Sequence, residues 1–423
     1  MIQNSRFFFL QKYVRLYKMM PSTELRSAFF DSGRMGHEGV FEMKRIVDVL
    51  KKAIGIVFLI AIGAVFGIFL GKFVGNYADS PIYVFLWLAL AIILYILQLI
   101  MHEAGHYLFG RLSGYTFVSF RIDNYTWIKE NGKLVLKRFK IPGTGGQCLM
   151  MPPKEDINGD KYVLYHMGGV IVNSIFTVSG VLMYFLCGSI NIKAVGAILA
   201  FVAGAAAITN GIPFKFAGIA NDGYQVMLLK KDKIARRSTY IMLKVNGLLT
   251  QGVRMKEMPY EWFVLPEEAD LSNPSNAAIR ILEGNWFFDK LQFEEAKTCY
   301  ETLLDDSIRL LDVHKMELQC EVLFFELMNM QRKDVIKDLY TRKMKSYIKT
   351  MSSVSINKKR LQYALCLYER KKGWEEELEK IYEEALKMRD TYPVKAEIEG
   401  EMEVFDFLRA PKQIFANWEE NSF

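Results

Sequence analysis

The sequence "IYVFLWLALAIILYILQLIMHEAGHY", Ile82 to Tyr107, joins a long apolar run to a short group of ionisable residues. The run from Ile82 to Met101 carries no charge, and as an α-helix it would be about 30 Å long, the thickness of the hydrocarbon core of a bilayer. Two histidines and a glutamate follow it directly. Ionisable groups at membrane depth are costly and usually functional, so this stretch predicts a membrane-spanning helix with a site at its end.

The composition separates the chain into an apolar part and a charged part. Of the 423 residues, 51% are hydrophobic, and the long apolar segments lie between residues 53 and 214. The basic residues behind the net charge of +7 flank these segments and form no stripe with interleaved aromatic side chains. This pattern indicates membrane topology and argues against a nucleic-acid partner. The five cysteines are widely spaced, which predicts neither a disulfide framework nor a zinc ribbon.

We predict a mainly α fold with about four membrane spans, at residues 53–74, 82–108, 162–190 and 194–214. Residues 1–52 form a basic N-terminal arm, in which Met43 opens a segment that resembles a natural protein start, so either Met1 or Met43 could be the start. The loop at 114–161 is expected to hold a small cytoplasmic β-hairpin. The membrane-embedded core therefore covers residues 53–233.

Positive charge in the short connections predicts the orientation of the spans. The loop at 114–161 carries eight Lys and Arg residues, whereas residues 76–81 carry none and residues 189–193 carry one. Basic loops remain on the cytoplasmic side, so both termini and this loop should be cytoplasmic. The compact plan of four spans suggests a multi-pass protein of a bacterial plasma membrane, with lipid around it.

The residues His102-Glu103-Ala104-Gly105-His106 form an HExxH pattern. Helical residues four apart share one face, so both imidazoles can reach one metal ion, and Glu103 lies beside them as a candidate base. Zinc suits this set, and a third protein ligand is then required. The alternative is that both histidines are satisfied interior residues and Glu103 is an anchor at the membrane interface.

Five sequence elements resemble, in the same order, those of the intramembrane site-2 metalloproteases. The HExxH pattern is followed by "GTGGQCLMMPP" (143–153), similar to the glycine-pair strand of that family, and by "HMGGVIVN" (166–173), similar to its Gly-Pro-x-x-Asn element. "TNGIP" (209–213) and "NDG" (221–223) resemble its Asn-x-x-Pro and Leu-Asp-Gly elements. The resemblance covers residues 82–232, about a third of the chain.

This resemblance implies a zinc-dependent endopeptidase that cuts membrane-inserted or membrane-proximal protein segments, in regulated intramembrane proteolysis or in peptide processing. It implies a role for each matching residue: His102, His106 and Asp222 bind zinc, Glu103 is the general base, Asn173 and Asn210 hold the substrate backbone or the oxyanion, and Gly145, Gly146, Gln147 and Cys148 present a strand edge to the substrate.

The chain also departs from the family pattern. Val170 replaces the usual proline, Asn221 replaces leucine, and the spacing from Asn210 to Asp222 is longer than usual. Asn173 could instead join two helices, and Asp222 could be the N-cap of the helix that follows it. These departures support an alternative in which the protein is an inactive membrane adaptor whose helical repeats bind partners. A transporter with a buried metal is disfavoured because the spans show no internal duplication.

The C-terminal part is expected to be cytoplasmic and helical. Residues 234–275, with three prolines near their end, predict a linker, and residues 276–423 contain amphipathic helical segments. Tyr300, Tyr340 and Tyr382 recur about 40 residues apart, which indicates an α-solenoid with a loose resemblance to tetratricopeptide repeats. The concave face of such a solenoid would suit a cytoplasmic protein or peptide partner.

Overall fold

A computed structural model describes residues 81–130, 132–138, 145–153, 161–216, 219–308, 310, 312–329, 332–392 and 394–409, together with residues 64 and 68. The predicted N-terminal arm lies outside the described residues, and so does the predicted span at 53–74 apart from residues 64 and 68. The described part is mainly helical, with one small antiparallel sheet and one two-stranded hairpin.

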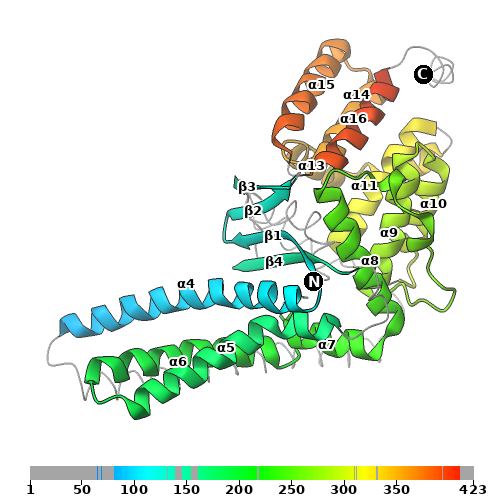
Figure 1. Cartoon of the computed structure of the whole chain (residues 1–423). Helices are drawn as coiled ribbons and strands as arrows, with labels where there is room; N and C mark the ends of the chain where they lie inside the picture. Colours follow the sequence, from blue (N-terminus) through cyan, green and yellow to red (C-terminus); the bar gives the residue numbers. More distant parts are fainter. Residues whose placement is uncertain are drawn as a thin grey trace, which may run out of the picture.

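Three described helices are long and apolar enough to cross a membrane, and they lie side by side in Figure 1: α4 (Pro81–Leu112), α5 (Lys161–Leu186) and α6 (Ile190–Gly211). They correspond to the second, third and fourth predicted spans, although α6 begins four residues earlier than expected. Large apolar side chains on their outer surfaces are exposed, such as Phe85 at 71% and Phe185 at 73%. Lipid would cover such a surface, so the described residues indicate a membrane protein.

Glycines set how closely the three helices approach. A Cβ atom on Gly105 of α4 would lie 2.5 Å from the carbonyl oxygen of Gly168 in α5. A Cβ on Gly180 of α5 would likewise lie 2.5 Å from the backbone nitrogen of Ala200 in α6. Small residues let helix backbones meet in this way, which is how membrane helices gain packing energy without a hydrophobic drive.

The loop between α4 and α5 contains a four-stranded antiparallel sheet, which is larger than the β-hairpin predicted from the sequence. Its strands are β1 (Thr116–Ile122), β2 (Tyr125–Glu130), β3 (Lys133–Arg138) and β4 (Gly146–Met151), in the order β3-β2-β1-β4. The sheet is larger because β1 pairs on one side with β2 and on the other with β4. Positive φ angles at Asp123 (47°) and Gly132 (79°) allow the tight turns. Strand β4 is therefore an edge strand, and it runs along α4 (Figure 1).

A short hairpin links α6 to the next helices. It consists of β5 (Lys215–Phe216) and β6 (Ile219–Ala220), and it leads into α7 (Asp222–Lys231) and α8 (Lys233–Thr250). Asp232 ends α7 and also caps α8, because its Oδ1 accepts from the backbone N–H of Ala235 at 2.9 Å.

The segment 234–275, predicted as a linker, is largely structured. Helix α8 fills its first half, and two short 3₁₀ turns follow, η1 (Met255–Glu257) and η2 (Tyr260–Trp262). The hydroxyl of Tyr240 donates to the carbonyl of Pro153 at 2.6 Å, and Phe263 is fully buried. The apolar side chains of α8 pack against the sheet and α9. This segment therefore joins the membrane helices and sheet to the C-terminal helices as packed structure.

The C-terminal helices share one large buried core and stack beside the sheet (Figure 1). They are α9 (Pro274–Asp289), α10 (Phe293–Leu304), α11 (Asp312–Asn329), α12 (Lys333–Leu339), α13 (Arg342–Met351), α14 (Ile356–Glu369), α15 (Trp374–Thr391) and α16 (Lys395–Arg409). Tyr300 and Tyr382 lie within α10 and α15, whereas Tyr340 directly follows α12. The three tyrosines therefore do not occupy one repeated position, and the helical repeat stays a prediction.

Candidate metal centre

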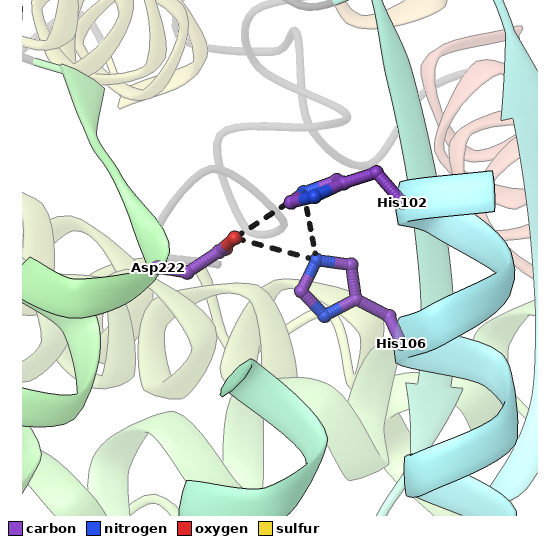
Figure 2. Close-up of side chains that lie close together, drawn as sticks. All are labelled: His102, His106 and Asp222. Carbon is purple, nitrogen blue, oxygen red and sulfur yellow. Dashed lines mark hydrogen bonds and ion pairs between the residues drawn. The ribbon is translucent and has the colours of Figure 1, made fainter. Parts of the chain in front are cut away.

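Three predicted ligand side chains meet at the cytoplasmic end predicted for α4 (Figure 2). Nε2 of His102 lies 3.2 Å from Nε2 of His106, and Oδ2 of Asp222 lies 3.3 Å from the first nitrogen and 3.5 Å from the second. The histidines come from one face of α4 and the aspartate from the first turn of α7. The structure thus brings together residues that are far apart in the sequence.

The separations and the chemistry of the three groups suit a tetrahedral zinc ion. Ligands bound at about 2.0–2.1 Å in a tetrahedron are about 3.3 Å apart, close to the three observed distances. Oδ2 of Asp222 is buried and, apart from the two imidazole nitrogens, has no polar partner among the described residues, as expected of an atom that faces a cation. Three protein ligands would leave one position open for water or substrate.

The backbone of α5 fixes the orientation of His106. Its Nδ1 lies 2.9 Å from the carbonyl oxygen of Tyr165. A carbonyl can only accept, so Nδ1 carries the ring proton and the lone pair of Nε2 faces the other two ligands. His102 is seated by a glycine, because a Cβ atom on Gly169 would overlap its imidazole. The pair Gly168-Gly169 therefore serves both the helix contact and the site.

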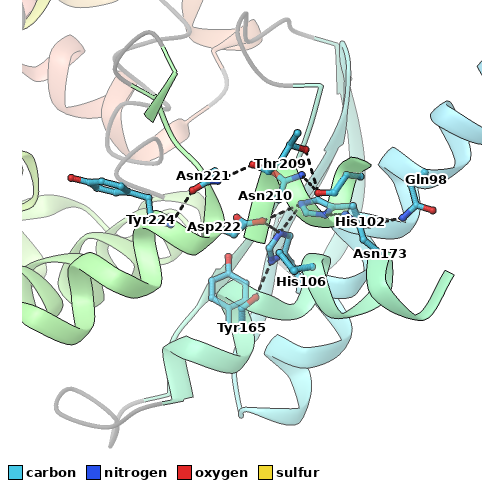
Figure 3. A network of polar contacts seen from close by, with 12 residues as sticks. Gln98, His102, His106, Tyr165, Asn173, Thr209, Asn210, Asn221, Asp222 and Tyr224 are labelled. Atoms are coloured by element: carbon cyan, nitrogen blue, oxygen red, sulfur yellow. Dashed lines mark hydrogen bonds and ion pairs between the residues drawn. The ribbon is translucent and has the colours of Figure 1, made fainter. Parts of the chain in front are cut away.

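His102 is held by side chains instead. Nδ2 of Asn173 lies 3.0 Å from Nδ1 of His102, and the amide of Gln98 donates to Oδ1 of Asn173 (Figure 3). Asn173, for which the resemblance implied substrate contact, is fully buried and directed at a predicted metal ligand. Gln98 was not among the site residues predicted from the sequence, although it is a polar residue one turn before His102 in an otherwise apolar span, which could have indicated its role.

Glu103 lies between the histidines and the edge strand β4. Its side chain is buried against Gly146, where an added Cβ would lie 2.7 Å from its Cγ. It interacts electrostatically with both imidazoles and with Arg121 of β1. Arg121 donates to the carbonyl of Gly146 at 3.2 Å, and burial lowers its pKa to about 10, an effect that Glu103 partly offsets. The carboxylate of Glu103 thus lies near both the imidazoles and the start of β4.

Only the first part of β4 is open. Gly145 is exposed and Gly146 and Gln147 are half-buried, but Cys148 is buried and burial raises the pKa of its thiol well above the usual value. The carbonyl of Cys148 already accepts from the hydroxyl of Tyr165 at 2.8 Å. Of the four predicted substrate contacts on this strand, Cys148 is therefore the least available.

The structure does not direct Asn210 toward the other predicted substrate residues. Its Nδ2 donates to the carbonyl of Ala206, one turn earlier in α6, at 2.9 Å. One N–H of this amide is therefore used within α6, and the predicted contact of Asn210 with a substrate stays a prediction.

Asn221 closes the lengthened connection before Asp222 (Figure 3). Its Nδ2 donates to the carbonyls of Thr209, at 2.8 Å, and Ile212, and its Oδ1 accepts from the backbone N–H of Tyr224 at 2.9 Å. Asn221 is thus the N-cap of α7, a role that the sequence had left open for Asp222. Burial raises the pKa of Asp222, but the imidazoles of His106 and His102 outweigh this effect and hold it below its usual range. Asp222 is left free to face the histidines as an anion.

No protein-family model, curated protein or solved structure matches the chain.

Proposed function

We propose that the protein is an intramembrane zinc metalloendopeptidase that hydrolyses peptide bonds in membrane-inserted or membrane-proximal segments. The observation that carries the proposal is the meeting of His102, His106 and Asp222 at the end of an apolar helix. Two buried imidazoles beside a half-buried carboxylate have little structural use there, since ionisable groups in a membrane-spanning helix are costly. Their separations suit zinc, and Glu103 is adjacent.

The residues of the chain divide the proposed chemistry between them. A zinc ion held by the three ligands would lower the pKa of water to near neutrality and polarise a peptide carbonyl. The carboxylate of Glu103 takes a proton from the attacking water, holds it on a carboxyl oxygen, and returns it to the leaving amine. Helices α4, α5 and α6 exclude bulk water around the reacting groups.

Strand β4 would hold the substrate. Backbone groups in lipid need partners, so a helical segment must find new hydrogen bonds when it is unwound for cleavage. As an edge strand of the described sheet, β4 would offer such partners by strand addition near Gly146, beside Glu103. Main-chain bonds select little sequence, so the substrate class is an extended peptide segment of a membrane protein.

The predictions from the sequence about membrane, topology and partner are also part of this proposal. The protein would be a multi-pass protein of a bacterial plasma membrane with four spans, of which the first lies at 53–74. Its termini and sheet would be cytoplasmic, and the C-terminal helices, as a repeat domain, would bind a cytoplasmic protein partner.

Replacement of Glu103 by glutamine tests the function directly. Full-length wild type and Glu103→Gln should both bind one zinc ion per chain, whereas the variant should lose at least about 100-fold in hydrolysis because it lacks the general base. New protein N-termini in the membrane fraction of expressing cells are the readout, and Glu261→Gln, at an exposed position, is the matched control. Identical N-termini in wild type and Glu103→Gln, or wild type without zinc, would reject the proposal.

A further inference from the structure

A chain of two buried amides ends on one predicted metal ligand. Gln98 of α4 donates to Oδ1 of Asn173 in α5, and Nδ2 of Asn173 lies 3.0 Å from Nδ1 of His102 (Figure 3). The exposed fractions are 4% for Gln98, 0% for Asn173 and 8% for His102, so water cannot readily replace either contact. The state of the His102 ring is therefore coupled to the orientation of these amides.

The hydrogen bonds as described place the ring proton of His102 on Nε2. The amide nitrogen of Asn173 can only donate, so Nδ1 of His102 accepts and the ring proton sits on the other nitrogen. That Nε2–H faces Nε2 of His106 at 3.2 Å, where a lone pair is fixed by the bond from Nδ1 to Tyr165. The same Nε2–H also lies 3.3 Å from Oδ2 of Asp222, so it has an acceptor without a metal, but a protonated Nε2 cannot bind one.

If the side-chain amide groups of Asn173 and Gln98 each rotate by half a turn, their oxygen and nitrogen atoms exchange places. The donors and acceptors are then reversed, and every contact is kept. Oδ1 of Asn173 then accepts from Nδ1–H of His102, and Nδ2 of Asn173 donates to Oε1 of Gln98. One N–H bond of the imidazole breaks at Nε2 and one forms at Nδ1, so the ring carries a single proton throughout. The lone pair of Nε2 is now directed at His106 and Asp222, and no buried polar atom of the pair has lost its partner.

We propose that Gln98 and Asn173 are positioning residues that set the tautomer of His102, and that their paired amides turn over when the site takes up zinc. The proposal rests on the metal site of the proposed function. It explains why both positions carry amides, since a carboxylate can only accept and an ammonium can only donate, whereas an amide can do either. It also differs from the substrate-binding role that the resemblance implied for Asn173.

Zinc affinity of the full-length protein in detergent, measured by competition with a chromogenic chelator, tests the role of Asn173. Asn173→Leu removes the partner of Nδ1 and should weaken zinc binding about 10- to 100-fold, as loss of an outer partner of a ligating histidine does. Asn173→Asp can only accept, favours Nδ1–H, and should remain within about threefold of wild type. Gln98→Leu should show a smaller loss than Asn173→Leu. Ser179→Ala is the control, because Ser179 is half-buried on the same helix and its hydroxyl donates to the carbonyl of Ile175, one turn earlier, at 2.9 Å.

The tautomer itself can be read without metal or substrate. In the zinc-free chain labelled with ¹⁵N-histidine, which has five histidines, His102 should carry its proton on Nε2 in wild type and on Nδ1 in Asn173→Asp. A wild-type His102 protonated on Nδ1, or an Asn173→Leu variant that binds zinc as tightly as wild type, would overturn the proposal. If Asn173→Asp bound zinc normally but lost hydrolysis, Asn173 would instead contact the substrate. The Glu103→Gln variant tests the proposed function separately. It should lose peptidase activity, whereas its zinc affinity and the tautomer of His102 should be unchanged.

Discussion

Oδ2 of Asp222 lies 3.3 Å from Nε2 of His102, although the whole of α5 and α6 separates the two residues in the sequence. This contact makes Asp222 the residue on which a three-ligand site depends. Asp222→Ala should lower zinc affinity by more than about 100-fold, a larger loss than removal of an outer partner causes. Zinc per chain after gel filtration, and chelator competition, measure the change. Asp306→Ala, at an exposed loop position, should bind like wild type, and equal affinity in both variants would contradict the assignment.

Two substitutions at Asn221 separate helix capping from loop closure. Asn221→Asp keeps an oxygen for the N–H of Tyr224 but loses the bonds from Nδ2 to Thr209 and Ile212. Asn221→Ala loses both, and loss of the cap should cost about 1 kcal/mol more in unfolding free energy. We expect both variants to bind zinc more weakly than wild type, because the loop then holds Asp222 less firmly. Unchanged zinc affinity in both would show that Asn221 does not position the ligand.

The approach of α4 and α5 predicts a strong effect of one added methyl group. A Cβ on Gly168 would lie 2.5 Å from the carbonyl oxygen of Gly105, inside the HExxH turn. Gly168→Ala should therefore push the helices apart, cost about 1–3 kcal/mol and weaken zinc binding. Gly188→Ala is the matched control, since nothing lies within 4 Å of an added Cβ there. Thermal unfolding in detergent should separate the two, and equal midpoints would contradict the packing argument.

Lipid and helix geometry allowed the sequence to predict three of the long apolar helices and the shared face of His102 and His106, whereas Asp222 was predicted only through the family resemblance. An uncharged run of bilayer length must be helical, and its period places His102 and His106 on one face. The four-stranded sheet was not predicted, because pairing of β1 with β4 depends on contacts across a loop that has no strong alternating pattern. The alternative that Asn173 joins two helices agrees with its hydrogen bonds from α5 to α4, but its particular partners, Gln98 and His102, depend on how the two helices cross at Gly105 and Gly168.

The structure of the segment 234–275 also depends on contacts that the sequence pattern does not predict. Its prolines suggested a linker, but they lie after α8, and the apolar positions of α8 find partners only in the folded chain, such as Met151 of β4 beside Gly247. Composition can identify an apolar face but cannot name what covers it. The residues that hold elements together therefore emerged only from the structure, whereas the HExxH residues were recognisable from their spacing.

A buried ion pair in the C-terminal helices predicts how stability depends on alkaline pH. Lys358 of α14 is fully buried, with its Nζ 3.1 Å from Glu317 of α11. Burial lowers the pKa of Lys358, but Glu317 outweighs that effect and raises it above its ordinary value. A raised pKa means that the pair stabilises the fold fully below the unfolded-state pKa of about 10.4, and that this contribution is lost as pH rises further.

Urea unfolding of the full chain should therefore show constant stability from this pair up to about pH 10 and a decline above it. The double variant Lys358→Met/Glu317→Leu should lack this decline, whereas Lys358→Met alone should lose about 3–5 kcal/mol at neutral pH, because the buried carboxylate of Glu317 then loses this cation and keeps neutral partners such as the Tyr347 hydroxyl. Equal alkaline profiles for wild type and the double variant would contradict the assignment.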